Sequence, residues 1–276
     1  MRISRPIKRT GLGVAVALLL LIIWMVGQAS APPVIRFAHV RLAGWPSNAR
    51  PMRLILMSDL HVSRPGDTPD RLRDTIARVN NLHPDVVLIA GDFRATGIEG
   101  ARSFSIAKTV APLGDLRPRV GTYAILGNHD YDDPAQMRRR LADQDVRLLD
   151  NEAVRVGPLG IVAISDIFSH HADVGAALRS WHQSGGIPVV MTHSPDVIPD
   201  LPPAITLALA GHTHCGQVSL PIYGPPTTQS RFGRRYMCGM VREGPRTSII
   251  SAGLGVSGWP IRWNAPPDLW VVDVGG

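Results

Sequence analysis

Four apolar, strand-like stretches of this chain end in the same way, with a Gly or Ser followed by a cluster of Asp, His or Asn. The clusters are Ser58-Asp59-Leu60-His61, Gly91-Asp92, Gly127-Asn128-His129-Asp130 and Gly211-His212-Thr213-His214, and a fifth stretch ends in Thr192-His193. The carboxyl ends of parallel strands meet in one crevice, where such sheets bind ligands. A turn or a helix cap would explain any single cluster. All five together predict that these side chains gather at one site.

The first half of the chain alternates between strand and helix patterns. Residues 53–57 form a β-rich run, residues 69–82 carry apolar side chains at helical spacing, and residues 86–90 form an apolar run typical of a buried strand. This order indicates a βαβ unit in a largely buried sheet. The pattern continues with a helix near 103–110, a strand at 122–126 and a helix near 134–142.

The second half contains more strand patterns than one sheet needs. The strands are expected at 153–156, 161–165, 188–192, 205–210, 247–251 and 269–274, with one helix near 174–182. We therefore expect an α/β fold in which two sheets pack face to face with helices outside. Residues 221–246 are rich in Gly, Pro, Arg and aromatics, and are expected to form an irregular excursion over the site.

The N-terminus carries an apolar stretch, residues 11–26, that has no polar face and so does not suit a buried amphipathic helix. The basic residues before it are Arg2, Arg5, Lys8 and Arg9. Ala29-Ser30-Ala31 has the form of a signal-peptide cleavage site, but Pro32 directly follows it, so we favour an uncleaved anchor over a signal peptide. In either case the basic end is expected to stay cytoplasmic and the rest to be exported. The protein is then expected at the cell membrane with its catalytic domain on the periplasmic or extracellular side, or secreted if the leader is cleaved.

The expected organisation is a membrane segment at 1–31, a linker or edge segment at 32–51, and one catalytic domain at 52–276. The net charge of +7 falls to +3 without the four basic residues of the leader, so a nucleic-acid partner is not expected. Cys215 and Cys238 are too few for a disulfide framework, and one bridge or two thiols remain open. The oligomeric state also remains open.

The spacing within the clusters suits metal ions. Asp59 and His61 lie two apart in an extended chain, so both side chains can face one ion, and His212 and His214 share this spacing. The two oxygens of a carboxylate such as Asp92 can bridge two ions. Oxygen and imidazole ligands suit Mn, Fe, Zn or Co, and without a cysteine pair in the clusters a structural zinc site is not expected. Two such ions can polarise a phosphoryl group and hold a hydroxide for attack.

In order and content, the five clusters resemble the motif blocks of the calcineurin-like metallophosphoesterase superfamily. The resemblance implies a four-layer α/β/β/α sandwich of two mixed sheets, with a two-metal site at the strand C-terminal ends. It implies a first metal bound by Asp59, His61, Asp92 and His214, and a second bound by Asp92, Asn128, His193 and His212. It also implies that His129 contacts the phosphate and protonates the leaving oxygen, and that Asp130 orients His129.

The C-terminal region resembles one branch of this superfamily. Gly253-Leu254-Gly255, Ile261-Arg262 and Ala265-Pro266-Pro267-Asp268 are similar to the tail of its membrane-associated branch, which includes phosphodiesterases and hydrolases of UDP-2,3-diacylglucosamine. Two residues depart from the pattern, because Cys215 stands where a second glycine is expected and Asp268 where Glu is expected. Neither is expected to bind metal.

These patterns favour a metal-dependent hydrolase of a phosphodiester or phosphomonoester, with a lipid-linked ester as one candidate substrate. A UDP-2,3-diacylglucosamine pyrophosphohydrolase and a non-catalytic metal-binding module are the alternatives. One group of aromatic and basic residues could form an interfacial lip that admits a lipid headgroup, or could be buried under the excursion. Its members are Tyr223, Phe232, Trp259, Trp263, Arg231, Arg234, Arg235 and Arg262.

Overall fold

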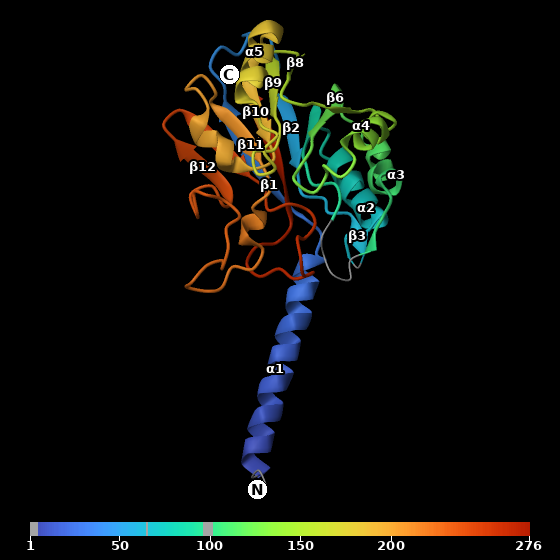
Figure 1. Ribbon diagram of the computed structural model, residues 1–276. Helices are drawn as coiled ribbons and strands as arrows, with labels where there is room; N and C mark the ends of the chain where they lie inside the picture. Colours follow the sequence, from blue (N-terminus) through green and yellow to red (C-terminus); the bar gives the residue numbers. More distant parts are fainter. Residues whose placement is uncertain (1–4, 65, 96–101) are drawn as a thin grey trace.

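The computed structural model describes residues 5–64, 66–95 and 102–276 (Figure 1). The predicted basic residue Arg2 lies outside the described residues. Two six-stranded sheets form the body of the fold. The first sheet has the order β1 (Val34–Arg41), β14 (Asp268–Gly275), β2 (Met52–Met57), β4 (Val86–Ala90), β6 (Gly121–Ile125) and β7 (Val146–Leu148). The second has the order β12 (Gly239–Glu243), β13 (Arg246–Ile250), β11 (Leu207–Ala210), β10 (Ile187–Thr192), β9 (Leu159–Ile164) and β8 (Ala153–Val156).

Both sheets are mixed. In the first, β14 runs antiparallel to β2 while the other pairs are parallel. In the second, the edge strands β12 and β8 are antiparallel to their neighbours. A short antiparallel pair, β3 (Ser63–Arg64) with β5 (Arg102–Ser103), lies outside both sheets.

Helices cover the outer face of each sheet. The first sheet is covered by α2 (Pro69–Asn80), α3 (Ile106–Val110), the 3-10 turn η1 (Ala111–Asp115) and α4 (Pro134–Ala142), and the second by α5 (Val174–Ser184) and the 3-10 turn η2 (Pro195–Asp200). Since side chains alternate along a strand, Leu54 and Leu56 of β2 enter the core between the sheets, whereas Ile55 packs toward α2. The predicted α/β fold with four layers is confirmed.

The start of α2 shows how the local sequence sets an element. Thr68 caps the helix by accepting a hydrogen bond from the Arg71 backbone N–H, and Pro69 occupies the first turn, where its missing N–H has no consequence. Leu72, Ile76 and Val79 are then buried at helical spacing. The predicted helix at 69–82 is therefore present and ends at Asn80.

Several boundaries differ from those predicted. Residues 32–51 contain β1, which pairs with β14 in parallel, so the fold begins upstream of residue 52. The helix predicted from residue 103 begins at Ile106, because Ser105 caps it. Strands β7 and β12 were not predicted, since β7 has three residues and β12 is half-exposed along most of its length with no alternation.

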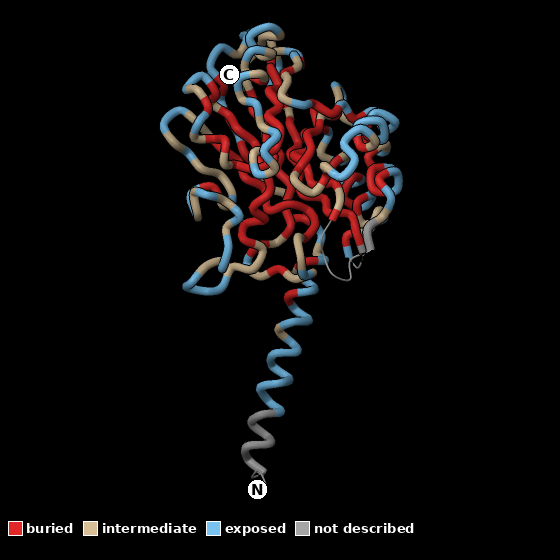
Figure 2. The backbone as a smooth tube through the Cα atoms, viewed as in Figure 1, coloured by how far each residue is buried: buried red, intermediate tan, exposed pale blue. Residues whose placement is uncertain are grey.

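Helix α1 (Arg5–Ala29) projects from the body of the fold (Figure 1). Its apolar stretch Leu12–Ala29 is the one helix in the described part of the chain that is long and apolar enough to cross a membrane. Figure 2 shows most of this stretch as exposed. An exposed face of Leu, Ile and Val along a whole helix suits a lipid environment and not water.

The strand directions place α1 at the same end of the molecule as the predicted site. Strand β1 follows α1 and runs away from it, β14 is parallel to β1, and β2 is antiparallel to β14. Strand β2 therefore runs back toward the end of the fold from which α1 leaves. The strands β4 and β6 are parallel to β2, so the clusters that follow all three strands lie at this end.

Candidate metal centre

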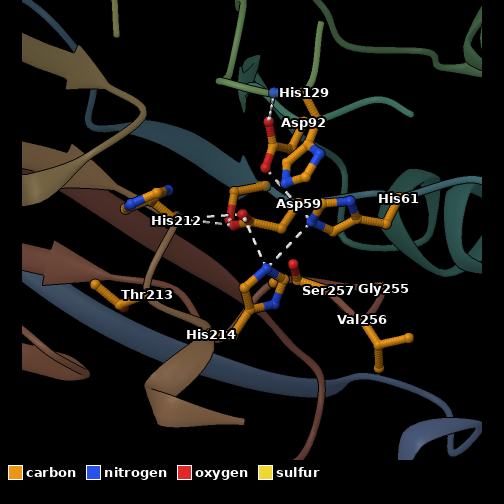
Figure 3. A network of polar contacts seen from close by, with 12 residues as sticks. Asp59, His61, Asp92, His129, His212, Thr213, His214, Gly255, Val256 and Ser257 are labelled. Atoms are coloured by element: carbon orange, nitrogen blue, oxygen red, sulfur yellow. Dashed lines mark hydrogen bonds and ion pairs between the residues drawn. The ribbon is translucent and has the colours of Figure 1, made fainter. Parts of the chain in front are cut away.

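The structure brings together, at the carboxyl ends of β2, β4, β6, β10 and β11, the side chains that were predicted to bind metal, five of which are labelled in Figure 3. They are Asp59, His61, Asp92, Asn128, His193, His212 and His214. Most of these side chains are buried, and Asn128 is half-buried. The packing of the two sheets against each other therefore brings five separate segments of sequence into one cluster.

The first group of possible ligands is Asp59, His61 and His214. The Nε2 atoms of His61 and His214 lie 3.1 Å apart. His214 Nε2 lies 3.5 Å from Asp59 Oδ1, and His61 Nε2 lies 3.4 Å from Asp92 Oδ2. Three ligand atoms of this group lie within 4.8 Å of one another, close enough to bind one ion.

The second group contains Asp59, Asp92 and His193. His193 Nε2 lies 3.3 Å from Asp92 Oδ2, 3.0 Å from Asn128 Oδ1 and 3.2 Å from His212 Nδ1. Asp92 thus contacts a histidine of each group, as expected of a bridging carboxylate. Asp59 also belongs to both groups, whereas the sequence pattern assigned it to the first metal alone.

The donor atoms fit divalent cations. Burial lowers the pKa of His61 to about 4 and the pKa of His212 to about 4, so both rings are neutral at neutral pH and keep a lone pair for a metal. The Nε2 atom of His212 is buried and has no hydrogen-bond partner among the described residues. Several lone pairs that face one another without intervening hydrogens are stabilised by a cation. Imidazole and carboxylate donors suit Mn, Fe, Zn or Co.

His193 carries more positive charge than its neighbours in the cluster. Burial alone would lower the pKa of His193. The adjacent Asp92 carboxylate raises this pKa by a larger amount, so the pKa of His193 lies well above its usual value. The pKa of Asp92 is correspondingly held low, because His193 and His61 outweigh the effect of burial. A cation at this position would replace the proton on His193.

Backbone groups fix the orientation of the histidine rings. His61 Nδ1 lies 3.2 Å from the Arg94 carbonyl oxygen, and His193 Nδ1 lies 2.7 Å from the Ala90 carbonyl oxygen. A hydrogen bond from Nδ1–H to a carbonyl leaves Nε2 as the acceptor that faces the cluster. The Nε2 atom of His61 therefore presents a lone pair to the cluster, and the Nε2 atom of His193 would do so once a cation replaces its proton.

Hydrogen bonds also fix the carboxylates of Asp59 and Asp92. The His212 backbone N–H donates to Asp59 Oδ1 and Oδ2 at 3.1 and 3.0 Å, and the His129 backbone N–H donates to Asp92 Oδ1 at 2.9 Å. The Ser58 hydroxyl donates to Asp59 Oδ2 at 2.5 Å. These contacts tie each strand end to the next, and Ser58 is a supporting residue to which the sequence pattern gave no role.

The predicted catalytic pair also lies here. His129 lines the crevice beside the cluster, with its ring centre 5.1 Å from that of His61. The buried Asp130 carboxylate accepts hydrogen bonds from the backbone N–H groups of Phe93 and Gly127, both at 3.0 Å. Burial, and then the Asp92 charge, raise the pKa of Asp130 to about 7. Asp130 thus joins the ends of β4 and β6 and shapes the turn that carries His129.

The backbone at the cluster is unusual. Left-handed conformations occur at Asp59, His61, Asp92, His212 and His214, with φ between 41° and 71°. Asp and His adopt this region more readily than most residues with side chains, but each such residue still costs stability. The shared conformation turns successive side chains out of the strand direction and toward the cluster.

The glycines of the clusters allow the strand ends to approach one another closely. A Cβ on Gly127 would overlap the Asp92 carboxylate, and a Cβ on Gly211 would overlap Ser58 and Asp59. Both positions therefore need glycine for lack of space. The Gly-Asp and Gly-Asn pairs in the sequence reflect this packing of one strand end against the next.

Arg262 follows one of the two alternatives predicted for its group, an interfacial lip or a buried position. Its side chain is fully buried. Its guanidinium donates to the carbonyl oxygens of Gly255 at 2.5 Å, Ala252 at 2.8 Å and Ala265 at 2.7 Å, and lies 3.5 Å from His214 Nδ1. Arg262 is buried because three loop carbonyls that face inward need donors.

The two departures from the family pattern have structural explanations. Cys215 forms a disulfide with Cys238, with Cα atoms 4.6 Å apart, and has a φ of 53°, the conformation that glycine adopts easily. The buried Asp268 carboxylate accepts hydrogen bonds from Ser251 Oγ at 2.8 Å and Arg36 Nε at 2.7 Å. Neither residue belongs to the two possible metal groups.

A crevice of about 260 Å³ opens beside the cluster. It is lined by Asp92, Asn128, His129, Phe168, His212, His214, Gln229 and Ser257. The sequence gave no sign of Phe168, Gln229 or Ser257, which come from three irregular segments. Phe168 is half-exposed and packs against the His212 ring, with ring centres 4.8 Å apart. A second cavity of about 190 Å³ shares His214, Gln229 and Ser257 and extends toward Gln217.

Comparison with known proteins adds a family match. Residues 52–216 match the family described as calcineurin-like phosphoesterase. A zebrafish (Danio rerio) protein named transmembrane protein with metallophosphoesterase domain is 28% identical over 279 residues, which cover 94% of this chain and 61% of the relative. An uncharacterized metallophosphoesterase of Helicobacter pylori is 29% identical over 229 residues, covering 79% of this chain and 58% of the relative. This chain thus spans about three fifths of the length of these two relatives.

A bacterial relative is covered more fully. The phosphodiesterase YaeI of Escherichia coli is 27% identical over 248 residues, which cover 85% of this chain and 86% of the relative. The matched family region begins at β2 and ends just after the last of the five clusters.

Proposed function

We propose that this chain, which belongs to the calcineurin-like phosphoesterase family and is a hydrolase of phosphoric ester bonds, cleaves a phosphodiester of a lipid-linked substrate with two divalent cations. The observation that carries the proposal is the pair of buried ligand groups that meet at Asp59 and Asp92. The relative named as a phosphodiesterase favours a diester over a monoester. Mn, Fe, Zn and Co are the candidate ions.

Each predicted ligand receives a role in this proposal. Asp59, His61, Asp92 and His214 would hold the first cation, and Asp92, Asn128, His193 and His212 the second. When bound, the two cations supply positive charge that polarises the phosphoryl group and acidifies water. The protein's part is to hold the donors in fixed positions, through the contacts from Ser58, His212 and the two carbonyls described above.

His129 is proposed to donate a proton to the leaving oxygen. It lines the crevice next to Asp92, and its backbone N–H holds the Asp92 carboxylate. Asp130 is proposed to act as a positioning residue, because it fixes the turn on which His129 lies. Proton transfer by a positioned histidine is a common contribution to ester hydrolysis.

The N-terminal helix and the relative named as transmembrane indicate a membrane protein. We propose that α1 is an uncleaved anchor and that the catalytic domain lies on the exported side, as the basic N-terminus favours. Ala29 at the possible cleavage site is buried, and the carbonyl oxygens of Ala29 and Ala31 accept hydrogen bonds from Arg71. A segment docked in this way is a poor substrate for a peptidase.

UDP-2,3-diacylglucosamine is a more specific candidate substrate. It requires a different membrane orientation of the catalytic domain. We expect its hydrolysis to require the catalytic domain on the cytoplasmic side. A reporter fused to the C-terminus distinguishes the two cases, since activity of the reporter only in the cytoplasm would favour this lipid and contradict the export proposal. The alternative of a non-catalytic module predicts loss of ligands, whereas the predicted ligand residues are all gathered here.

The test of the proposed function uses the full chain in detergent. Hydrolysis of an aryl phosphodiester and of the matching monoester is measured with added Mn and again after chelation. Chelator-sensitive cleavage that favours the diester is expected. Equal cleavage after chelation, or no cleavage of either ester, would contradict the proposed mechanism.

A further inference from the structure

The end of α1 is fixed to the catalytic domain. The Arg262 backbone N–H donates to the Met25 carbonyl oxygen at 3.0 Å, and Arg71 Nη2 donates to Ala29 O at 3.0 Å and Ala31 O at 2.9 Å. Met25 and Ala29 are buried in this contact. A membrane helix held at several points sets the orientation of the domain, whereas a free linker would not.

A single residue, Arg262, connects the end of α1 to the metal centre. Arg262, whose backbone holds α1, also holds the loop carbonyls of Ala252 and Gly255 and approaches His214 with its side chain. The Trp263 ring meets the Trp24 ring of α1 edge to face, with ring centres 6.2 Å apart. Tryptophan is typical of the boundary between bilayer and water. The loops around the site therefore lie at the end of the fold from which α1 projects (Figure 1).

Three large apolar side chains on these loops are exposed. Ile222 is 99% exposed, Tyr223 is 78% exposed and Trp259 is 80% exposed. Ile222 and Tyr223 occupy the tip of a turn closed by two hydrogen bonds between Leu220 and Gly224, at 3.0 and 2.8 Å. Ile222 also has a φ of 69°, which is costly for a β-branched residue. Full exposure and backbone strain at one isoleucine both disfavour this tip in water.

Hydrogen bonds connect the loops of the exposed side chains to the cavity beside the crevice. Gln217 donates to the carbonyl oxygens of Ser257 at 2.9 Å and Trp259 at 3.2 Å, and Val218 pairs with Trp263. Gln217 and Ser257 both line the cavity that joins the crevice. The loop that carries Trp259 is thus tied to a residue of this cavity, and the turn that carries Ile222 and Tyr223 follows Gln217 and Val218 along the chain.

We propose that Ile222, Tyr223 and Trp259 form a lip that inserts into the bilayer surface around α1, and that the crevice receives its phosphodiester from the headgroup layer at this lip. The proposal deepens the proposed function and rests on it for the substrate. It names a lipid bilayer as the partner, because the lip lies beside a helix that is itself suited to a bilayer.

The charges near the lip favour apolar insertion over attraction to anionic lipid. Arg231 pairs with Asp200 at 2.9 Å, and Arg235 pairs with Glu243 at 2.6 Å. Two of the four predicted lip arginines are thus neutralised within the protein, whereas Arg234 donates to the Tyr223 carbonyl oxygen and Arg262 is buried. We therefore expect insertion into uncharged phosphatidylcholine as well as into anionic membranes.

The direct test measures contact with lipid and needs no enzymatic activity. The full chain is reconstituted in phosphatidylcholine vesicles with an environment-sensitive fluorophore at Ile222→Cys, Trp259→Cys or the control Val120→Cys. Val120 is apolar and 47% exposed, and precedes β6 at the opposite end of the sheet. No free cysteine competes for the label in the described chain, because Cys215 and Cys238 are paired. Lipids that carry a quencher should dim the fluorophore at 222 and 259 but not at 120.

Equal quenching at all three positions, or none at 222 and 259, would overturn the lip. A second measurement compares wild type with Ile222→Ser on a phosphodiester lipid in vesicles and on the soluble aryl diester. The ratio of the two rates should fall by about tenfold, the effect of losing one buried isoleucine contact. An unchanged ratio would overturn entry of substrate at the lip. Failure of wild type on both esters would instead contradict the proposed function, while the quenching result would still decide the lip.

Discussion

The metal centre and the lip lie at the same end of the molecule but are built in opposite ways. The residues of the metal centre follow buried strands, and most of their side chains are buried and tied to one another by hydrogen bonds. The lip lies on irregular loops, and its three apolar side chains face outward. Fixed, dry donors suit the binding of ions, whereas exposed apolar side chains suit contact with a bilayer. The comparison indicates that catalysis and membrane contact are separable by substitution.

Backbone strain also differs between the two regions. In the metal centre it falls on Asp and His, which tolerate the left-handed conformation and hold it through several contacts. In the lip it falls on Ile222, whose side chain is fully exposed. Strain in the centre is compensated inside the protein, whereas strain in the lip would be compensated by lipid.

Removing a shared ligand should have the largest effect and should be confined to the metal centre. Asp92→Asn is expected to reduce turnover by at least about a thousandfold, because it removes the charge that both cations share. Rates on the aryl diester test this, with the exposed Asp143→Asn as the control. Lipid quenching of the fluorophore at Ile222→Cys should be the same when Asp92→Asn is added. Loss of this quenching would show that the metal centre and the lip are not separable.

A matched pair of glycines tests how closely the centre is packed. Gly91 and Gly244 both have positive φ, but a Cβ at Gly91 would lie 2.7 Å from Gly127 Cα while one at Gly244 has open space. Gly244→Ala should lower stability by ~1 kcal/mol through strain alone. Gly91→Ala should lower it by about 3 kcal/mol or more, because overlap with the backbone is added. Thermal unfolding in detergent measures both, and equal losses would contradict close packing at the strand ends.

Arg262 connects the two regions, so its removal should affect both. Arg262→Met leaves three buried carbonyls without a donor, and we expect a loss of about 2–3 kcal/mol in stability. The exposed Arg140→Met serves as the control and should change little. A shift in the melting temperature no larger than that of Arg140→Met would show that Arg262 does not support the loops.

The smallest expected effect is a gain in stability at the lip. Ile222→Gly relieves the left-handed strain and removes an exposed apolar side chain, so the domain in detergent should gain ~1 kcal/mol. The same variant should bind bilayers less well, as judged by quenching from a label at Trp259→Cys. A loss of stability in Ile222→Gly would instead indicate that Ile222 packs against the protein, and would contradict the proposal that Ile222 inserts into the bilayer.

Much of the metal centre could be predicted from sequence because each part follows a simple strand. An apolar run that ends in glycine and then in Asp or His specifies both a strand end and a ligand, as at Gly91-Asp92. The strand patterns of the second half, more than one sheet needs, predicted the two sheets. The segment of β1 was predicted as a linker or edge segment, because Pro32, Pro33 and Pro46 surround it and hide the strand signal, and β1 is the edge strand of the first sheet.

The parts that sequence did not give come from irregular segments. Phe168, Gln229 and Ser257 reach the crevice through loops whose paths depend on packing across the whole fold. Arg262 stands between Trp259 and Trp263 in a segment that suggests an exposed, amphipathic surface, yet its side chain turns inward to satisfy carbonyls. The local sequence does not indicate which buried backbone carbonyls will need a hydrogen-bond donor. The pairing of Cys215 with Cys238 is likewise a matter of distance in space.

The short connection between α1 and β1 limits where this hydrolase can act. Only residues 30–33 separate the helix from the first strand, and Ala31 is itself held by Arg71. A chain of four residues spans at most about 14 Å, so the crevice stays at one height above the bilayer. With α1 as the proposed anchor, substrates confined to the same leaflet would meet the crevice by lateral diffusion in two dimensions, at a high effective concentration. Esters attached to larger assemblies farther from the membrane would lie beyond its reach.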